Sequence, residues 1–165
     1  WLQRDGELSG QNRAENYLDL VALDDVDGFR GPEVYSVNGD VIEMEFVDGE
    51  DLVMEMDEDP AKAELMGERL KNAHESGVAF RDFNSGNFVW DGKDIIPVDA
   101  ERFSADASII DIQYDQAAAF YSFEQVHGFD EETLSMFSQG YGYIRNKEEI
   151  YRSISGLWEE TKSLC

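Results

Sequence analysis

Apolar and polar positions recur with two different periods along the chain, and these periods predict helices and strands in a definite order. In residues 12–23, apolar side chains recur at helical spacing: Ala14, Tyr17, Leu18, Val21 and Ala22. Asn38-Gly39 separates two strand-like segments, 33–37 and 41–46, and this dipeptide is a strong short-range signal for a β-hairpin. Asp59-Pro60 has the pattern of an N-cap followed by proline, and predicts a helix that ends near Gly77.

The second half of the chain continues with one more hairpin and then helices only. Residues 88–90 and 94–98 form the second predicted hairpin, with Asp91-Gly92 as its turn. A helix is predicted from about Asp115 to His127, a short one after the cap Asp130, and a last one from near Asn146. The apolar face of this last helix consists of Ile150, Ile154, Leu157, Trp158 and Leu164. The order of elements predicts an α+β fold.

Polar side chains gather at the open end of the second hairpin. With a two-residue turn, Trp90 pairs with Lys93, and Asn87 lies opposite Ile96, close to the segment that ends in Asp99. Asp82 lies in a loop that arrives at the same end. Mg²⁺ prefers such hard oxygen ligands and usually takes one or two carboxylates together with substrate phosphates. The third group is then free to orient a hydroxyl nucleophile.

The same residues stand in a motif order that resembles protein kinases. Residues 74–87, with the sequence HESGVAFRDFNSGN, resemble the end of a kinase helix and the catalytic loop D-x-x-x-x-N, with Phe80 where kinases usually have His. Residues 95–101 resemble the strand and Asp of the D-F-G element. Residues 44–49 resemble the hinge of the Bud32 and RIO kinases. Glu15 resembles the glutamate of helix αC, and Asp115 resembles the αF aspartate that steadies the catalytic loop by hydrogen bonds.

This resemblance implies a protein-kinase-like fold with ATP and Mg²⁺ as cofactors, divided into a partial N-lobe over residues 1–47 and a mostly helical catalytic C-lobe over residues 48–165. By resemblance, Asp82 accepts the proton of the substrate hydroxyl, while Asn87 and Asp99 hold Mg²⁺ on the ATP phosphates. The cofactor-binding positions implied are Glu15 on the helix and the hinge residues, whose backbone groups bind adenine: Glu45, Phe46 and Val47.

Several kinase features are missing from the sequence. There is no G-x-G-x-x-G, no Lys before Lys62, and only 44 residues precede Glu45, so the N-lobe is expected to be truncated. Asn84 replaces the catalytic-loop Lys, and the stretch from Asp99 to Asp111 has no room for a long activation segment. These traits fit the Bud32/RIO-type atypical serine/threonine kinases and their aminoglycoside-phosphotransferase-like relatives. A serine/threonine kinase, a small-molecule kinase and a non-catalytic pseudokinase that binds a partner therefore remain as hypotheses.

The composition restricts the classes of molecule that the chain is expected to bind. The chain has 37 acidic and 13 basic residues, a formal net charge of −24, and the acids are scattered along it. Such a field repels nucleic acid and anionic membranes, and indicates a halophilic source or a basic protein partner. The single cysteine, Cys165, allows no internal disulfide, and no apolar run approaches the ~18 residues of a membrane span, so a cytoplasmic location is expected. His74 is expected to pack at a helix end, and His127 is expected in the last turn of a helix beside Gly128, where a cation suits the helix dipole.

The charge generates the first prediction. Raising the ionic strength from low to molar KCl should raise the melting temperature, because salt screens the repulsion among the surplus carboxylates. Thermal melts at the two salt concentrations measure the effect. Equal midpoints would contradict the halophilic interpretation.

Overall fold

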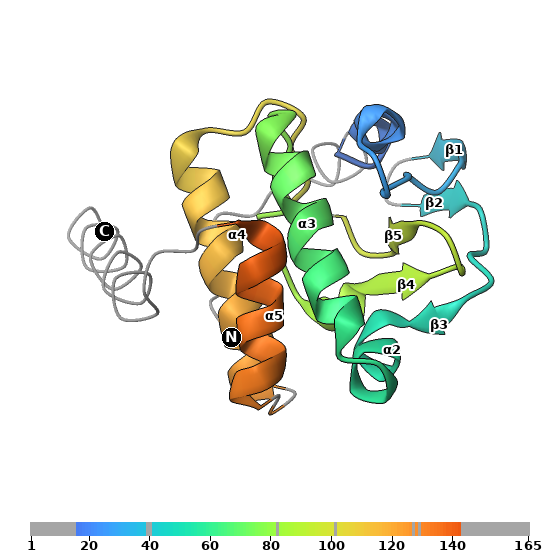
Figure 1. Cartoon of the computed structure of the whole chain (residues 1–165). Helices are drawn as coiled ribbons and strands as arrows, with labels where there is room; N and C mark the ends of the chain where they lie inside the picture. Colours follow the sequence, from blue (N-terminus) through green and yellow to red (C-terminus); the bar gives the residue numbers. More distant parts are fainter. Residues whose placement is uncertain are drawn as a thin grey trace.

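The computed structural model describes residues 16–38, 41–81, 83–100, 102–126, 128 and 130–142. Within them, three long helices pack together on one side and two small antiparallel sheets lie on the other (Figure 1). This mixture of helices and sheets confirms the α+β prediction. The predicted helix from Asn146, like Glu15, Asp82 and His127, lies outside the described residues.

The first described segment is helical in two different ways. Residues 16–18 are α-helical, and the chain then tightens into the 3₁₀-helix η1 (Asp19–Asp25), so the prediction of one regular helix over 12–23 is wrong in its second half. The apolar residues Leu20 and Leu23 are nonetheless buried. Neither residue belongs to the predicted apolar face. Of that face, Tyr17 is buried but Leu18 and Val21 are 54% and 68% exposed, so the predicted burial pattern is wrong in part.

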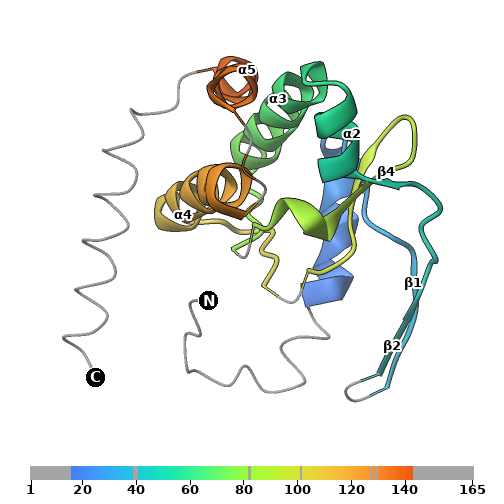
Figure 2. The same cartoon turned by 90° about the horizontal axis from the view of Figure 1, so that it is seen from below.

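The first hairpin forms where the Asn-Gly signal predicted it. Strand β1 (Val34–Asn38) pairs with β2 (Val41–Met44), and Asn38 lies opposite Val41, so Asn38 ends the strand instead of opening the turn. Figure 2 shows this hairpin at the outer edge of the molecule, away from the helices.

Two elements between the hinge and the first long helix were not anticipated. Strand β3 (Glu50–Asp51) is followed at once by helix α2 (Leu52–Glu58), whose first turn is capped by the Asp51 carboxylate, which accepts the amide of Val53 at 2.8 Å. The next helix is α3 (Ala61–Glu75), and the carboxylate of Asp59 accepts the Ala61 amide at 3.2 Å. The Asp-Pro pair precedes the helix as predicted, but the helix begins at Ala61, one residue after the predicted first helical position at Pro60.

The second hairpin joins β3 in a three-stranded sheet of order β3-β4-β5. Strands β4 (Phe88–Trp90) and β5 (Ile95–Pro97) are antiparallel, but Trp90 pairs with Ile95 and not with Lys93. The connection is a four-residue loop because the Asp91 carboxylate accepts the amides of Lys93 and Asp94, at 2.9 and 2.8 Å. The predicted two-residue turn is therefore wrong.

Helix α4 (Ile109–Tyr121) begins six residues before the predicted start at Asp115. Ser108 and Asp111 form a reciprocal capping box there, which satisfies backbone donors of the first turn. The chain continues as a π-helix, η3 (Ser122–Val126), and then as α5 (Glu131–Tyr141), which Asp130 caps as predicted. In the described part of the chain, no helix combines the length and the apolar character that a membrane crossing requires.

An aromatic cluster centred on Phe80 fills the space between the sheet and the helices. Its ring lies 5.1–6.2 Å from four other buried rings, those of Phe29, Phe83, Phe88 and Phe103. Phe80, at the position where kinases usually have His, is therefore a buried residue of the hydrophobic core.

Helices α3 and α5 approach closely at two glycines. A methyl group on Gly67 would collide with the carbonyl of Phe137, and one on Gly140 would collide with the carbonyl of Glu64. The glycines therefore set the spacing of the two helices, although glycine lowers the intrinsic stability of each helix.

Gly67→Ala and Gly140→Ala should each lower the free energy of unfolding by about 1–3 kcal/mol, because backbone carbonyls cannot move away as a flexible side chain could. Urea denaturation measures this. Gly86→Ala is the matched control, because its new methyl group would lie no closer than 3.7 Å to a neighbouring atom. A stabilising effect at both helix positions would contradict the close-approach account.

Candidate functional site

The loop of residues 80–87 is held to helix α4 first through Asp115. The Asp115 carboxylate is completely buried and accepts the amides of Phe80 and Arg81, at 2.5 and 2.7 Å. Arg81 has a φ of 59°, which is unfavourable for a residue with a side chain. The two charge-assisted bonds hold the backbone in this conformation immediately before Asp82.

A second attachment follows on the other side of Asp82. Ser122, at the start of the π-helix, accepts the amide of Ser85 at 3.1 Å, and the two hydroxyl oxygens lie 2.7 Å apart. Asp82 itself is outside the described residues. The residues that precede and follow it are thus fixed to α4 and η3.

A buried polar network surrounds Asp115. His74 Nε2 lies 3.4 Å from the Asp115 carboxylate, and His74 Nδ1 lies 2.6 Å from the hydroxyl of Tyr141, which also accepts a bond from Gln116 at 2.8 Å. Burial raises the pKa of Asp115, while bonds from His74 and the two amides act in the opposite direction. His74 lies at a helix end and is buried, as expected, but its contacts are polar and link α3, α4 and α5.

The candidate metal ligands Asn87 and Asp99 lie on adjacent chain segments. The amide of Val98 donates to the carbonyl of Asn87 at 2.8 Å, so Asn87 lies opposite Val98 and not Ile96. With this register, Asn87 lies opposite the residue next to Asp99. It is therefore nearer to Asp99 across the hairpin than the predicted pairing with Ile96 would place it. The Asp99 side chain is exposed, and the next amide, that of Ala100, donates to the Tyr17 hydroxyl at 3.4 Å.

These two residues fit a magnesium ion bound with a nucleotide. An amide oxygen and a carboxylate oxygen are hard ligands, and Mg²⁺ usually completes its octahedron with phosphates and water instead of further side chains. Among the described residues there is no cluster of three or more His, Cys, Asp or Glu side chains that could hold a metal. A dedicated all-protein cage is thus not found in that part of the chain.

The three hinge residues differ in their surroundings. The amide of Glu45 donates to the carbonyl of Glu33 at 2.7 Å, so an adenine ring at this residue could use its carbonyl but not its amide. The Phe46 side chain is 88% exposed, and Val47 is half-buried. The counterpart expected on the helix, Glu15, lies outside the described residues.

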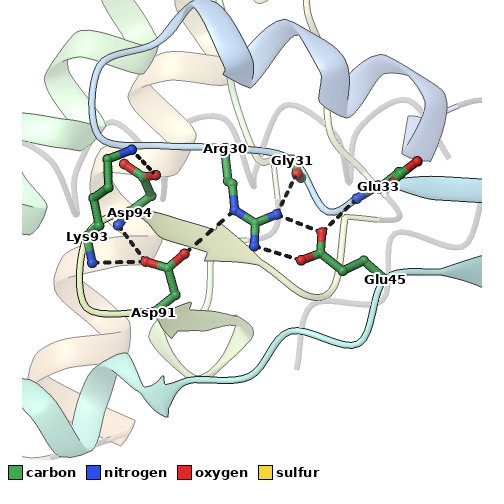
Figure 3. Close-up of polar contacts among 7 residues, drawn as sticks. All are labelled: Arg30, Gly31, Glu33, Glu45, Asp91, Lys93 and Asp94. Carbon is green, nitrogen blue, oxygen red and sulfur yellow. Dashed lines mark hydrogen bonds and ion pairs between the residues drawn. The ribbon is translucent and has the colours of Figure 1, made fainter.

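Arg30 is a residue of this region that the sequence analysis missed. Its guanidinium forms two bonds with the Glu45 carboxylate, of 2.7 and 2.8 Å, and its Nε lies 3.7 Å from the Asp91 carboxylate (Figure 3). The sequence contains one feature that could have indicated a role for Arg30, since it is the only basic residue between Arg13 and Lys62.

The Arg30 hydrogen bonds lower the pKa of Glu45. The paired carboxylate therefore stabilises the fold above the ordinary glutamate pKa, and this contribution is lost as the pH falls through the lowered value.

Comparison with known proteins relates this chain to others through structure alone. No protein-family model matches the sequence, and no curated protein matches it. Among solved structures, that of WaaP in complex with acyl carrier protein superimposes with a TM-score of 0.60 and 19% sequence identity, over 90% of this chain and 74% of that chain. This likeness in structure supports a protein-kinase-like fold for the chain.

Proposed function

We propose that this protein is an ATP- and Mg²⁺-dependent phosphotransferase that acts on a hydroxyl group. The observation that carries the proposal is the attachment of the residues just before Asp82 to α4: Asp115 accepts the amides of Phe80 and Arg81, and Arg81 has a positive φ. The buried carboxylate holds Arg81 in a backbone conformation that is costly for a residue with a side chain. Strain of this kind is typical of positions where a side chain must be presented to a substrate.

In this proposal Asp82 is the general base. It accepts the proton of the acceptor hydroxyl as the hydroxyl oxygen forms a bond to the γ-phosphorus of ATP, and the bond from that phosphorus to the β,γ-bridging oxygen breaks and releases ADP. Asn87 and Asp99 would hold Mg²⁺, which neutralises charge on the phosphates. The backbone of Glu45, Phe46 and Val47 would bind adenine. Glu15, two residues before Tyr17 in the sequence, would take the place of the αC glutamate.

The short segment after Asp99 bears on the kind of acceptor. Ser104 and Ala79 exchange two backbone hydrogen bonds, of 3.0 and 2.9 Å, and the Ala107 amide donates to the Gly77 carbonyl at 2.8 Å. The described residues of this segment pair with the residues just before the catalytic loop and lead into α4, and they form no extended platform for a peptide. This supports a small hydroxylated acceptor.

A serine or threonine side chain of a protein is the second candidate acceptor. The hinge-like segment around Glu45, with its resemblance to Bud32 and RIO kinases, favours it. A protein partner also belongs to the proposal, since the solved WaaP structure contains acyl carrier protein.

Asp99→Ala should abolish Mg²⁺-dependent ATP binding, because Asp99 supplies the carboxylate ligand, whereas Asp82→Ala should leave binding largely intact. Isothermal titration calorimetry with and without Mg²⁺ measures both. No Gly-rich loop occurs in the sequence, so the titration must reach millimolar ATP, where a complex is worth only about −4 kcal/mol. The scattered acidic charge favours a halophilic source, so each titration is repeated in molar KCl.

The outcomes separate the candidate functions. If a chain that includes any upstream segment binds no ATP in either salt, the phosphotransferase proposal fails and a partner-binding pseudokinase is the better account. Phosphorylation of small hydroxylated compounds supports the first acceptor class. Phosphorylation of serine or threonine in proteins alone supports the second.

Asp115→Asn should destabilise the fold by about 1–3 kcal/mol and slow phosphoryl transfer, because the amide side chain can accept through only one atom and leaves one of two backbone donors unpaired. Urea denaturation and transfer assays measure the two effects. Asp106→Asn, at an exposed position, is the control and should change neither. Unchanged stability in Asp115→Asn would contradict the role given to this carboxylate.

A further inference from the structure

Arg30 joins two parts of the proposed site that are distant in sequence. Its amide donates to the carbonyl of Ile95 at 3.3 Å, and the preceding Phe29 forms a parallel bridge with Ile95. The backbone of Arg30 is thus paired with β5, the strand that leads to Asp99. Its side chain reaches in the other direction, to Glu45 of the hinge (Figure 3).

The contact with Glu45 is specific in geometry. Two parallel bonds fix the plane of the carboxylate, and the Glu33 amide donates to the same carboxylate at 3.1 Å. The Arg30 and Glu45 side chains are 31% and 27% exposed, so water screens the pair only in part. An arginine can hold this arrangement, whereas a lysine presents a single point of charge.

Arg30 also contacts a second carboxylate, that of Asp91 in the β4–β5 loop. Its carboxylate lies 3.7 Å from Arg30 Nε and closes the β4–β5 loop through the Lys93 and Asp94 amides. The negative charge of Asp91 acts against the ionised form of Glu45, although the Arg30 hydrogen bonds outweigh this effect and lower the pKa of Glu45. Arg30 lies between them and compensates both, so its removal would push the hinge and the hairpin apart.

We propose that Arg30 is a positioning residue, which holds the hinge at Glu45 at a fixed distance from the hairpin that ends at Asp99. This inference rests on the proposed function, because it assumes that adenine binds at the hinge and that Asp99 holds the metal and phosphates. Arg30 touches neither ligand. It sets the separation between the adenine end and the phosphate end of one nucleotide.

The test compares two probes that differ in whether they span this separation. MgATP needs the hinge and the metal site together, whereas magnesium tripolyphosphate needs only the metal site. Arg30→Met should raise the Kd for MgATP about tenfold, the loss expected for a partly screened bidentate ion pair. The Kd for magnesium tripolyphosphate should change less than about twofold, because Asp99 and Asn87 stay paired through Val98.

Further variants identify the cause. Lys71→Met removes the same charge from the exposed Lys71–Glu75 pair on α3 and should leave both constants unchanged. Arg30→Lys should lie between wild type and Arg30→Met. The double variant Arg30→Met/Asp91→Asn should recover part of the MgATP affinity, since asparagine keeps the acceptor of the loop but removes one repelling charge.

A selective loss of MgATP affinity with this partial rescue supports the inference. Equal Kd values for wild type and Arg30→Met, or an equal weakening of both probes, would overturn the inference alone. A wild-type chain that binds tripolyphosphate but no better with the adenosine attached would overturn the adenine site of the proposed function, and this inference with it.

Discussion

A buried carboxylate and two backbone amides depend on one another at the centre of this molecule. Asp115 is completely removed from water, which is costly for an ionised group unless hydrogen bonds replace its hydration. The amides of Phe80 and Arg81 supply those bonds and would themselves be unsatisfied without it. Helix α4 therefore packs into the core with only one geometry of the backbone at Phe80 and Arg81, and the positive φ of Arg81 is a consequence.

The rest of the candidate site is assembled by contacts between segments that are far apart in sequence. The Val98 amide donates to the Asn87 carbonyl and so joins Asn87 to the segment that contains Asp99. On the other side of Asp99, the Ala100 amide donates to the Tyr17 hydroxyl. Arg30 connects the hinge to the β4–β5 hairpin. These contacts surround a loop whose own shape is fixed by α4, so that the loop, the hairpin and the hinge form one continuous structure.

The sequence predicted those features whose signals are local. A few consecutive residues determine each helix start and each hairpin. The side-chain bonds of Asp59 and Asp130 at helix starts and both hairpins are present in the structure. The register of the second hairpin could not be predicted from Asp91-Gly92, because the Asp91 side chain, and not the backbone alone, closes a four-residue loop. Strand β3 was missed because its two acidic residues show no alternation and form a strand only by pairing with β4. The motif order indicated which residues to propose for the site, whereas Arg30 is linked to them by tertiary contacts that no motif describes.

The central claim is that the end of the β4–β5 hairpin holds a divalent metal together with a nucleotide. Paramagnetic Mn²⁺ in place of Mg²⁺ tests it directly, since it broadens the NMR signals of nearby amides. The account predicts that Mn²⁺ with ATP selectively broadens the amide signals of Asn87, Val98 and Asp99 and spares those of helix α5. Broadening that is spread over the acidic surface, or that is the same with and without ATP, would contradict it.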